Sequence, residues 1–396
     1  MIGRGEYLLE VGARLWPPGV RVTQKQEANG TRAFLLIPSA DQPQLMVPAG
    51  APRAAAAAVA GFTGHRTGRD GWRSRGLRWF LRLGLGDRLL PRRLVVGPEP
   101  GVETYLAPIL GQSPLLAMHI GPPRANRKPV LQLLDPSGRV LGFAKIGTGG
   151  LTDELVDQEA RALARLAERP PVGVGVPQLL HRGRWRDLDV LVQAGLPVPG
   201  ARPPSPSRLT DAMIAVADSG PQETVPLQDC AFLDQLITDL AGLGSPGETL
   251  AADLTAVRSA EPDLNVRLGT SHGDWTPWNC ALGADGRLLL WDWERYRERV
   301  PRGLDALHHR LQCGLGSGTV APAVATDLLE ASPMLLEPFG VIPAEARLIG
   351  LLYLADLARR YLQDGQAAAG SRRGDVGGWL VPAVHQQTEQ LTEQRS

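Results

Sequence analysis

The sequence contains little cysteine, and it lacks the long apolar run that a membrane-spanning helix requires. Its three cysteines, Cys230, Cys280 and Cys313, are widely spaced and form no Cys-x-x-Cys pair, which argues against a disulfide scaffold and a structural zinc site. The longest apolar run near the N-terminus, residues 54–60, is too short to span a bilayer, and residues 1–10 do not have the shape of a signal peptide. These absences predict a cytoplasmic chain.

A strong overall charge is also missing. The formal net charge is +1 over 396 residues, so the charge does not favour a nucleic-acid partner, and we expect none. Hydrophobic residues make up 43% of the chain, which is enough to bury a sizeable core in about two to three domains. Function therefore has to be sought in the motifs.

The most informative motifs are SHGDWTPWN at residues 271–279 and LLLWDWE at residues 288–294. An aspartate followed by an asparagine at this spacing is typical of loops that transfer phosphoryl groups, in which the aspartate accepts the proton of the acceptor hydroxyl. We predict that His272 and Asp274 are catalytic and that Asn279 and Asp292 bind magnesium. Taken alone, a His-x-Asp sequence also arises by chance, and the tryptophans around it are expected to pack as core.

The residues between the two predicted magnesium ligands support this interpretation. Residues 280–290 alternate two short apolar runs with the turn sequence GADG, which predicts a β-hairpin. A hairpin returns the chain to its starting point, so Asn279 and Asp292 should emerge side by side, as two ligands of one hard cation must.

Further kinase-like features come earlier in the chain. Val130–Leu134 and Val140–Ile146 read as two strands joined by a turn, and the second strand carries Lys145. A lysine in this context matches the strand lysine that neutralises the α and β phosphates of ATP. The apolar strand 188–193 should lead into a hinge, where backbone groups of Val192, Gln193 and Ala194 would face an adenine.

A helix is predicted directly after the lysine strand. Residues 152–168 place acidic residues in the first turn and apolar residues at helical spacing. Glu159 is the expected ion-pair partner of Lys145, and Glu154 is the second candidate. Taken singly, Lys145 would more often be a surface lysine and Glu159 a solvated helix residue.

With these residues in place, the chain resembles the aminoglycoside phosphotransferase and choline kinase superfamily from about residue 113 onward. The resemblance implies an α+β, two-lobed protein-kinase-like fold, with a small antiparallel β lobe over 113–193 and a larger, mostly helical lobe over 194–396. It also implies ATP- and magnesium-dependent phosphorylation of a small-molecule hydroxyl, on an aminoglycoside, choline, ethanolamine or a sugar. GTP is the alternative donor.

The resemblance assigns roles residue by residue. The family's catalytic aspartate corresponds to Asp274, and its magnesium ligands correspond to Asn279 and Asp292. A later family aspartate corresponds to Asp305, whose implied role is to brace the catalytic loop.

One departure concerns the loop expected to cover the phosphates, residues 119–129, which has a single glycine. Pro122 and Pro123 remove two of the backbone N–H donors on which such a loop depends. Arg124, Arg127 and Lys128 could reach the phosphates instead, or the loop could be a solvated hairpin tip. This departure favours an alternative function, a catalytically silent nucleotide-binding module with a regulatory or scaffolding role.

Residues 1–112 have no counterpart in the resemblance and are expected to form an additional α/β segment. Residues 31–38 and 43–48 predict a β-hairpin, and 51–62 and 71–90 predict helices. The stretch 66–93 holds nine arginines against two aspartates. It could lie on an anionic membrane or an acidic partner, or it could pack on the kinase core with its arginines in water.

The C-terminal part carries a proline-rich linker, acidic residues and helical patterns. The linker spans 197–206. Residues 201–265 hold ten acidic residues against three arginines. The acidic residues would attract cationic acceptors, or they would simply line solvated helices. Helices are predicted over 232–243, 348–362 and 379–390.

Overall fold

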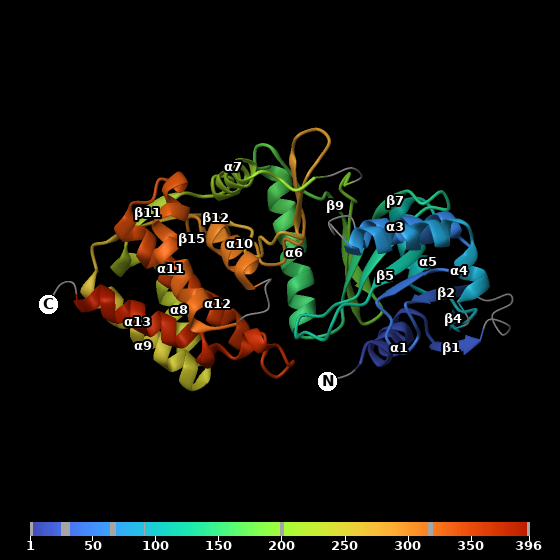
Figure 1. The fold of residues 1–396 in the computed structure, drawn as a ribbon, viewed down its shortest axis with the longest axis horizontal. Coiled ribbons are helices and arrows are strands. Elements are labelled where there is room, and N and C mark those ends of the chain that lie inside the picture. The colour runs from blue at the N-terminus through green and yellow to red at the C-terminus, as the bar shows by residue number, and fades with distance from the viewer. Residues whose placement is uncertain are drawn as a thin grey trace. The chain divides into compact units, whose positions relative to one another are not determined.

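The structure is a computed structural model that describes residues 3–24, 32–63, 69–90, 92–198, 202–315 and 320–393, with backbone alone at 24, 61–63 and 69–74. The chain divides into two compact units. Unit 1 comprises Met1–Ala160 and Pro177–Arg202, and unit 2 comprises Arg161–Val176 and Pro203–Ser396. Unit 1 is built on a sheet and unit 2 is mostly helical, which confirms the predicted α+β class (Figure 1).

Unit 1 contains an antiparallel sheet of nine described strands. In spatial order these are β1 (Val20–Gln24), β4 (Arg92–Val96), β2 (Arg32–Ile37), β3 (Leu45–Pro48), β5 (Leu115–His119), β6 (Val130–Leu134), β7 (Val140–Gly147), β10 (Leu188–Gln193) and β9 (Leu179–Trp185). The predicted hairpin is formed by β2 and β3, although residue 31 lies outside the described residues. Because β3 pairs with β5, strands from residues 1–112 continue directly into the strands that follow.

Both faces of the sheet are covered. Successive strand residues point to opposite faces, and the face that carries Ala144 and Ile146 packs against α1 (Arg4–Leu15) and α5 (Val102–Leu110). The fully buried Trp16, which follows α1, donates its Nε1–H to the carboxylate of Glu103 on α5 at 2.9 Å. The first 112 residues therefore supply one side of the core around the predicted lysine strand.

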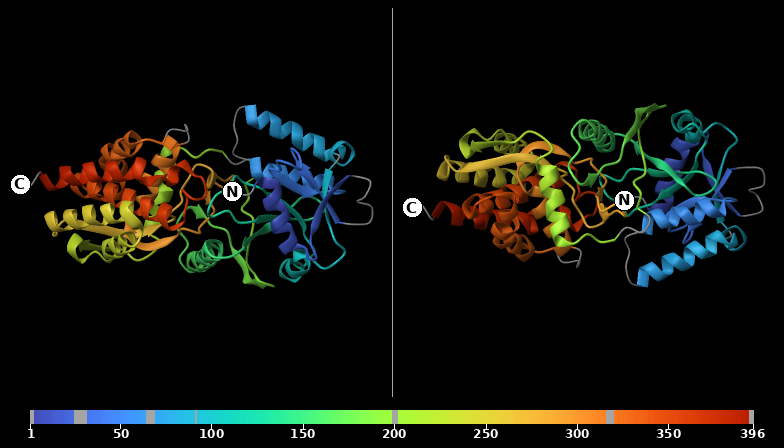
Figure 2. Two further views of the ribbon diagram at one scale, coloured as in Figure 1. Left: turned by 90° about the horizontal axis from the view of Figure 1, so that it is seen from below. Right: turned by 90° about the horizontal axis from the view of Figure 1, so that it is seen from above.

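The opposite face is covered by α2 (Pro52–Thr63), and α3 (Arg69–Arg82) lies outside α2 (Figure 2). The single helix predicted over 71–90 is wrong. Gly84 adopts a left-handed conformation with φ +71°, which ends α3 and starts the short α4 (Leu85–Leu89).

Unit 2 gathers most of the helices. Helix α6 (Leu151–Glu168) begins in unit 1 and ends in unit 2. The other helices are α7 (Pro206–Ala217), α8 (Ala231–Ala241), α9 (Gly244–Ala260), α10 (Leu304–Leu315), α11 (Pro322–Leu336), α12 (Pro343–Gln363) and α13 (Leu380–Glu393), with 3-10 turns η2 (Leu227–Asp229), η3 (Glu337–Phe339), η4 (Arg372–Gly374) and η5 (Val376–Gly378). The helices predicted around 232–243, 348–362 and 379–390 are confirmed as α8, α12 and α13.

Two small sheets complete unit 2. One contains β11 (Glu223–Pro226), β12 (Asn265–Ser271) and β15 (Arg297–Pro301), and the other contains β13 (Cys280–Leu282), β14 (Leu288–Leu290) and β8 (Val174–Gly175). The proline-rich linker ends where Ser205 caps α7, and its residues 199–201 lie outside the described part of the chain. None of the described helices is both long and apolar enough to cross a membrane.

Candidate phosphoryl-transfer site

The predicted catalytic loop joins β12 to β13 and is clamped at its start by Asp305. This buried carboxylate, in the first turn of α10, accepts hydrogen bonds from Ser271 Oγ at 2.9 Å, His272 N at 2.8 Å and Gly273 N at 2.9 Å. A carboxylate that satisfies several donors at once holds their backbone in one conformation. The geometry thus agrees with the bracing role that the resemblance implies.

Gly273 cannot readily be replaced in this loop. Its φ is +80°, and a Cβ atom built on it would lie 2.1 Å from the carbonyl oxygen of Arg295. The Gly273 carbonyl accepts a hydrogen bond from Arg360 Nη1 at 2.7 Å. The chain therefore turns tightly just before Asp274.

His272 fixes the loop to the end of the predicted hairpin. Its buried ring accepts the Asp274 N–H at Nδ1 (3.2 Å), and Nε2 lies 3.1 Å from the carbonyl oxygen of Trp291. These two contacts require the hydrogen on Nε2. The ring also packs edge-on against Trp275 and Trp293, which are fully buried. Both ring nitrogens are thus engaged by the loop and the end of the hairpin, and the catalytic role of His272 stays a prediction.

Asp274 is held at both carboxylate oxygens while its side chain stays 28% exposed. Oδ2 accepts a hydrogen bond from Asn279 Nδ2 at 3.1 Å, and Oδ1 lies 3.2 Å from His308 Nε2. Burial raises the pKa of Asp274, but the hydrogen bond from His308 and the charge of Arg360 outweigh it, so the pKa lies below its usual range. The carboxylate is therefore negative, oriented and accessible.

His308 was not predicted from the sequence. It lies three residues after Asp305 on α10, is 2% exposed at its side chain, and its Nδ1 lies 3.0 Å from the Tyr353 hydroxyl on α12. Burial lowers the pKa of His308 despite its contact with Asp274, so the ring is neutral, with Nε2–H donating to Asp274 and Nδ1 accepting from Tyr353. The helical spacing from Asp305 could have indicated His308, whereas no sequence signal pointed to Tyr353.

The predicted magnesium ligands come together as the hairpin geometry requires. Strands β13 and β14 pair antiparallel, and Trp291 N donates to Asn279 O at 3.0 Å. Asn279 Nδ2 is bonded to Asp274, which leaves the amide oxygen as a donor atom for a cation. Asp292 has φ +74°, a conformation that non-glycine residues seldom adopt and that occurs often at functional sites.

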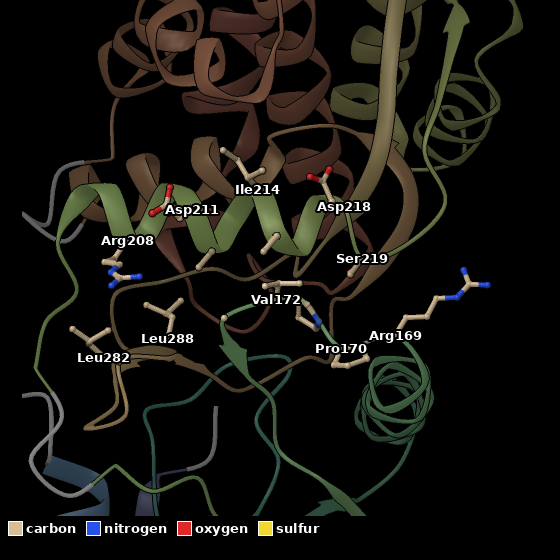
Figure 3. A pocket seen from close by; sticks show the side chains of 15 residues that line it. Arg169, Pro170, Val172, Arg208, Asp211, Ile214, Asp218, Ser219, Leu282 and Leu288 are labelled. Atoms are coloured by element: carbon tan, nitrogen blue, oxygen red, sulfur yellow. The ribbon is translucent and has the colours of Figure 1, made fainter.

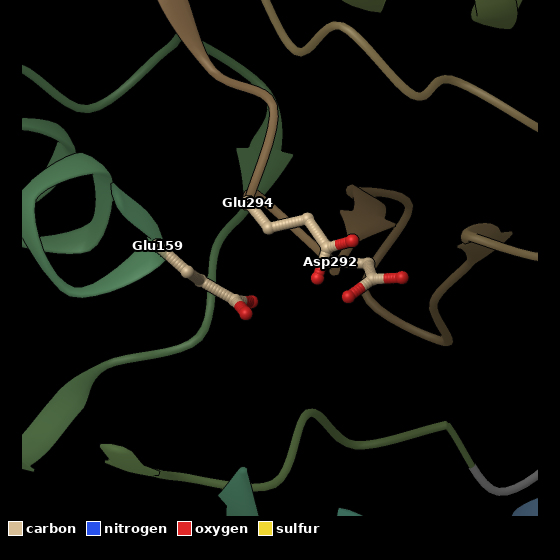
Figure 4. A group of neighbouring side chains, drawn as sticks. All are labelled: Glu159, Asp292 and Glu294. Carbon is tan, nitrogen blue, oxygen red and sulfur yellow. The ribbon is translucent and has the colours of Figure 1, made fainter. Parts of the chain in front are cut away.

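A third oxygen donor was not predicted. Glu294 is 4% exposed, and its carboxylate lies within 4.8 Å of that of Asp292. Figure 4 shows the two side chains leaving the same segment and ending beside one another. Carboxylate and amide oxygens are the donors that magnesium prefers, so this set of residues fits the ion.

In unit 1, Lys145 forms the ion pair for which Glu159 was the first candidate. Lys145 Nζ lies 2.6 Å from both Glu159 oxygens, and the two side chains are only 6% and 0% exposed. Glu159 projects from α6 (Figure 4), whereas the second candidate, Glu154, is exposed. The lysine is thus held rigidly on its strand.

The predicted hinge, Val192 to Ala194, differs from expectation at the backbone N–H of Ala194. Val192 and Gln193 lie inside β10, paired with β7 on one side and β9 on the other, and the Ala194 N–H donates to Gln178 O at 2.9 Å. The Ala194 N–H is therefore not available to an adenine, because it bonds the residue just before β9. By contrast, the buried Oε1 of Gln193 has no hydrogen-bond partner among the described residues.

The glycine-poor loop is anchored by α1. The Arg127 guanidinium lies over the Tyr7 ring at 3.5 Å from its centroid. Burial lowers the pKa of Arg127 and raises the pKa of Tyr7 to about 12. Two arrangements were predicted for this loop: arginines that reach the phosphates, or a solvated hairpin tip. Arg127 fits neither, because it is stacked on a residue of the N-terminal helix. Arg124 is exposed.

A cavity of about 660 Å³ in unit 2 lies apart from these residues. One wall is α7, with Asp211 and Ile214, and the other is formed by the turn at 169–173 and the hairpin residues Leu282 and Leu288 (Figure 3). None of the predicted site residues lines it.

No protein-family model matches the sequence, and no curated protein is detectably similar to it. Among solved structures, the chain is similar to a thermostable mutant of aminoglycoside phosphotransferase APH(4)-Ia in complex with ADP and hygromycin B. The identity is 13%, the alignment covers 72% of this chain and 98% of that chain, and the TM-score is 0.47. For macrolide 2′-phosphotransferase type I the identity is 16%, the coverage 74% and 95%, and the TM-score 0.41.

A third similar structure is an aminoglycoside phosphotransferase from Alicyclobacillus acidocaldarius subsp. acidocaldarius DSM 446. Its identity is 15%, the alignment covers 66% of this chain and 90% of that chain, and the TM-score is 0.34. These similar structures are all phosphotransferases by description.

Proposed function

We propose that this chain is a small-molecule kinase that transfers a phosphoryl group from ATP to a hydroxyl. The observation that carries the proposal is the state of Asp274, which is negative, fixed at both oxygens and still accessible. Transfer of a phosphoryl group depends mainly on positioning the acceptor and neutralising charge. Asp274 accepts the hydrogen of the acceptor hydroxyl and orients its oxygen for attack.

The remaining residues act on the phosphates. Lys145, fixed by Glu159, supplies a positive charge for the α and β phosphate oxygens. Asn279, Asp292 and Glu294 supply the oxygen donors for magnesium, which when bound neutralises charge on the transferred phosphate.

Gln193 favours ATP over GTP. Gln193 on β10 pairs with Phe143 on the neighbouring strand β7. Lys145 lies two residues after Phe143 on β7, and residues two apart on a strand point to the same face, so Gln193 and Lys145 share one face of the sheet. An unsatisfied buried oxygen is costly, and the amino group of adenine can donate to it, whereas guanine has an acceptor at the equivalent position.

The acceptor remains one of several hydroxyl compounds: an aminoglycoside, choline, ethanolamine or a sugar. The acidic residues expected to attract a cationic acceptor are partly committed to ion pairs. The pairs are Asp218 with Arg302, Glu223 with Arg299, Asp234 with Arg258, and Asp239 with Arg359. This observation weakens the case for a cationic acceptor.

The alternative function is a nucleotide-binding module without turnover. One observation favours it: Pro122 and Pro123 lack N–H groups and Arg127 is stacked on Tyr7, so the glycine-poor loop has few donors for phosphates.

The test is magnesium-dependent ATP or GTP consumption by the purified chain with a panel of aminoglycosides, choline, ethanolamine and sugars. Consumption that depends on an acceptor and disappears in Asp274→Asn is the expected result. Tight magnesium-dependent nucleotide binding without turnover for any acceptor would favour the alternative.

A further inference from the structure

The described part of the basic stretch presents large apolar side chains to solvent, and the proposed phosphotransferase chemistry does not use them. Trp79 is 66% exposed, Leu83 is 64% exposed and Leu89 is 65% exposed. Large exposed hydrophobic side chains close together in sequence are unusual unless they meet a partner.

Arginines and the tryptophan share the outward side of α3. Residues three, four and seven positions apart lie on one helix face, and the exposed residues at this spacing are Arg75, Arg78, Trp79 and Arg82. Leu83 follows directly, with its N–H bonded to Trp79 O at 3.0 Å. We call these five residues the arginine–tryptophan face.

The opposite side of α3 holds the helix in place. Leu81 is buried, and Leu77 and Phe80 pack against the same apolar cluster, which includes residues of α2. A Cβ atom on Gly86 would lie 2.7 Å from Leu81, so α4 also packs closely. The arginine–tryptophan face is therefore presented by a fixed element on the outside of unit 1 (Figure 2).

Two arginines of this face carry charge that is not neutralised within the described residues. Arg78 and Arg82 form no ion pair with any residue that the structure describes. The carboxylate of Asp87 is already engaged, since it accepts the Gly50 N–H at 2.9 Å and lies 3.6 Å from Arg93. Arg78 and Arg82 thus place positive charge next to the exposed Trp79 and Leu83.

We propose that the arginine–tryptophan face binds the surface of an anionic lipid bilayer. Tryptophan favours the headgroup level of a membrane, where its ring is apolar and its N–H finds water, and arginines gain from anionic lipid beside it. An acidic peptide would pair with the arginines, but its charge alone gives the exposed Trp79 and Leu83 no apolar contact. Two cavities in the described part of the chain are lined by unit 2 residues, and neither borders this face. The outer side of a single helix suits a broad, flat surface.

The test is sedimentation of the full chain with vesicles of phosphatidylcholine alone or of phosphatidylcholine with phosphatidylglycerol. We expect sedimentation with the anionic vesicles only. Arg78→Gln combined with Arg82→Gln should weaken partitioning about thirtyfold, the effect of two arginines at an anionic surface. Trp79→Ala should weaken it about tenfold.

Matched controls lie in unit 2. Arg310→Gln combined with Arg347→Gln removes the same charge from exposed positions, and Met334→Ala removes a side chain that is 73% exposed. These controls should sediment like the unchanged chain, and all variants should keep its thermal unfolding temperature, because the substituted side chains are exposed. Equal sedimentation with neutral vesicles, none with either, or equal losses in the controls would overturn the proposal. Displacement from the vesicles by soluble polyglutamate at low concentration would point to an acidic protein partner and would also overturn it.

Discussion

Lys145 in unit 1 and Asp274 in unit 2 are both charged, and the structure treats their charges in opposite ways. Lys145 is almost fully buried and lies 2.6 Å from both oxygens of an equally buried glutamate. Asp274 is 28% exposed, and its partners are a neutral histidine and an amide. Lys145 is balanced by a counter-charge in direct contact, whereas Asp274 is hydrogen-bonded by neutral groups and feels the charge of Arg360, which bonds the neighbouring Gly273 carbonyl.

The difference follows from what each group has to do. A charge removed from water needs an opposite charge nearby, because desolvation costs several kcal/mol. A carboxylate that must receive a hydroxyl from solvent has to keep an open side, and a full counter-charge on it would compete for the hydroxyl hydrogen. Neutral donors such as His308 and Asn279 orient Asp274 without neutralising it.

The largest expected effect is on turnover and tests the accessible carboxylate of Asp274. Asp274→Asn removes the acceptor for the hydroxyl hydrogen but keeps the shape of the side chain. Turnover should fall about a thousandfold, while nucleotide affinity changes little. Acceptor-dependent nucleotide consumption and equilibrium nucleotide binding measure the two quantities. Asp327→Asn, at an exposed position of α11, is the matched control and should keep full turnover. Near-normal turnover in Asp274→Asn would remove Asp274 from the chemistry.

Substitutions in the Lys145–Glu159 ion pair of unit 1 should change the free energy of unfolding. Glu159→Gln leaves the Lys145 charge buried without a counter-charge, which should lower the free energy of unfolding by about 3–5 kcal/mol. Combining Lys145→Met with Glu159→Leu removes both charges and should restore much of that loss. Urea denaturation of the two variants measures the difference. If the double variant is no more stable than Glu159→Gln, packing rather than charge balance holds these residues.

The sequence indicated the residues assigned to phosphoryl transfer better than the other residues that position them. Lys145, Asp274, Asn279 and Asp292 were predicted because phosphoryl transfer demands those residue types in a fixed order. Tyr353 lies within the leucine-rich part of α12, where nothing distinguishes a functional hydroxyl from a core residue. The contact between Arg127 and Tyr7 joins positions 120 residues apart, and no local pattern encodes it. Likewise, the pairing of β3 with β5 depends on tertiary packing, so residues 1–112 were expected as an addition to the fold.

The orienting role of His308 gives a smaller effect on turnover. His308→Leu removes a hydrogen bond to a charged group, which should lower kcat by about tenfold to a hundredfold. His308→Gln places an amide donor where Nε2–H lies and should recover most of that loss. KM for the nucleotide should stay constant in both variants, because His308 contacts Asp274 and not the predicted nucleotide ligands. Equal losses in His308→Leu and His308→Gln would mean that the site needs the shape of the ring and not its donor.

The smallest effect concerns an ion pair distant from the chemistry. His385 Nδ1 on α13 lies 2.9 Å from the buried carboxylate of Asp253 on α9. The hydrogen bond and charge of Asp253 raise the pKa of His385 above its ordinary value of 6.5. The raised pKa means that this pair stabilises the fold fully below pH 6.5, and that the contribution is lost as the pH rises through the folded-state pKa. His385→Asn, which keeps a donor but removes the charge, should therefore lower the unfolding temperature below pH 6.5 and leave it nearly unchanged at about pH 9. An equal decrease in unfolding temperature at both pH values would show that the imidazole contributes through packing. Stabilisation by charge balance would then be confined to fully buried pairs such as Lys145 and Glu159.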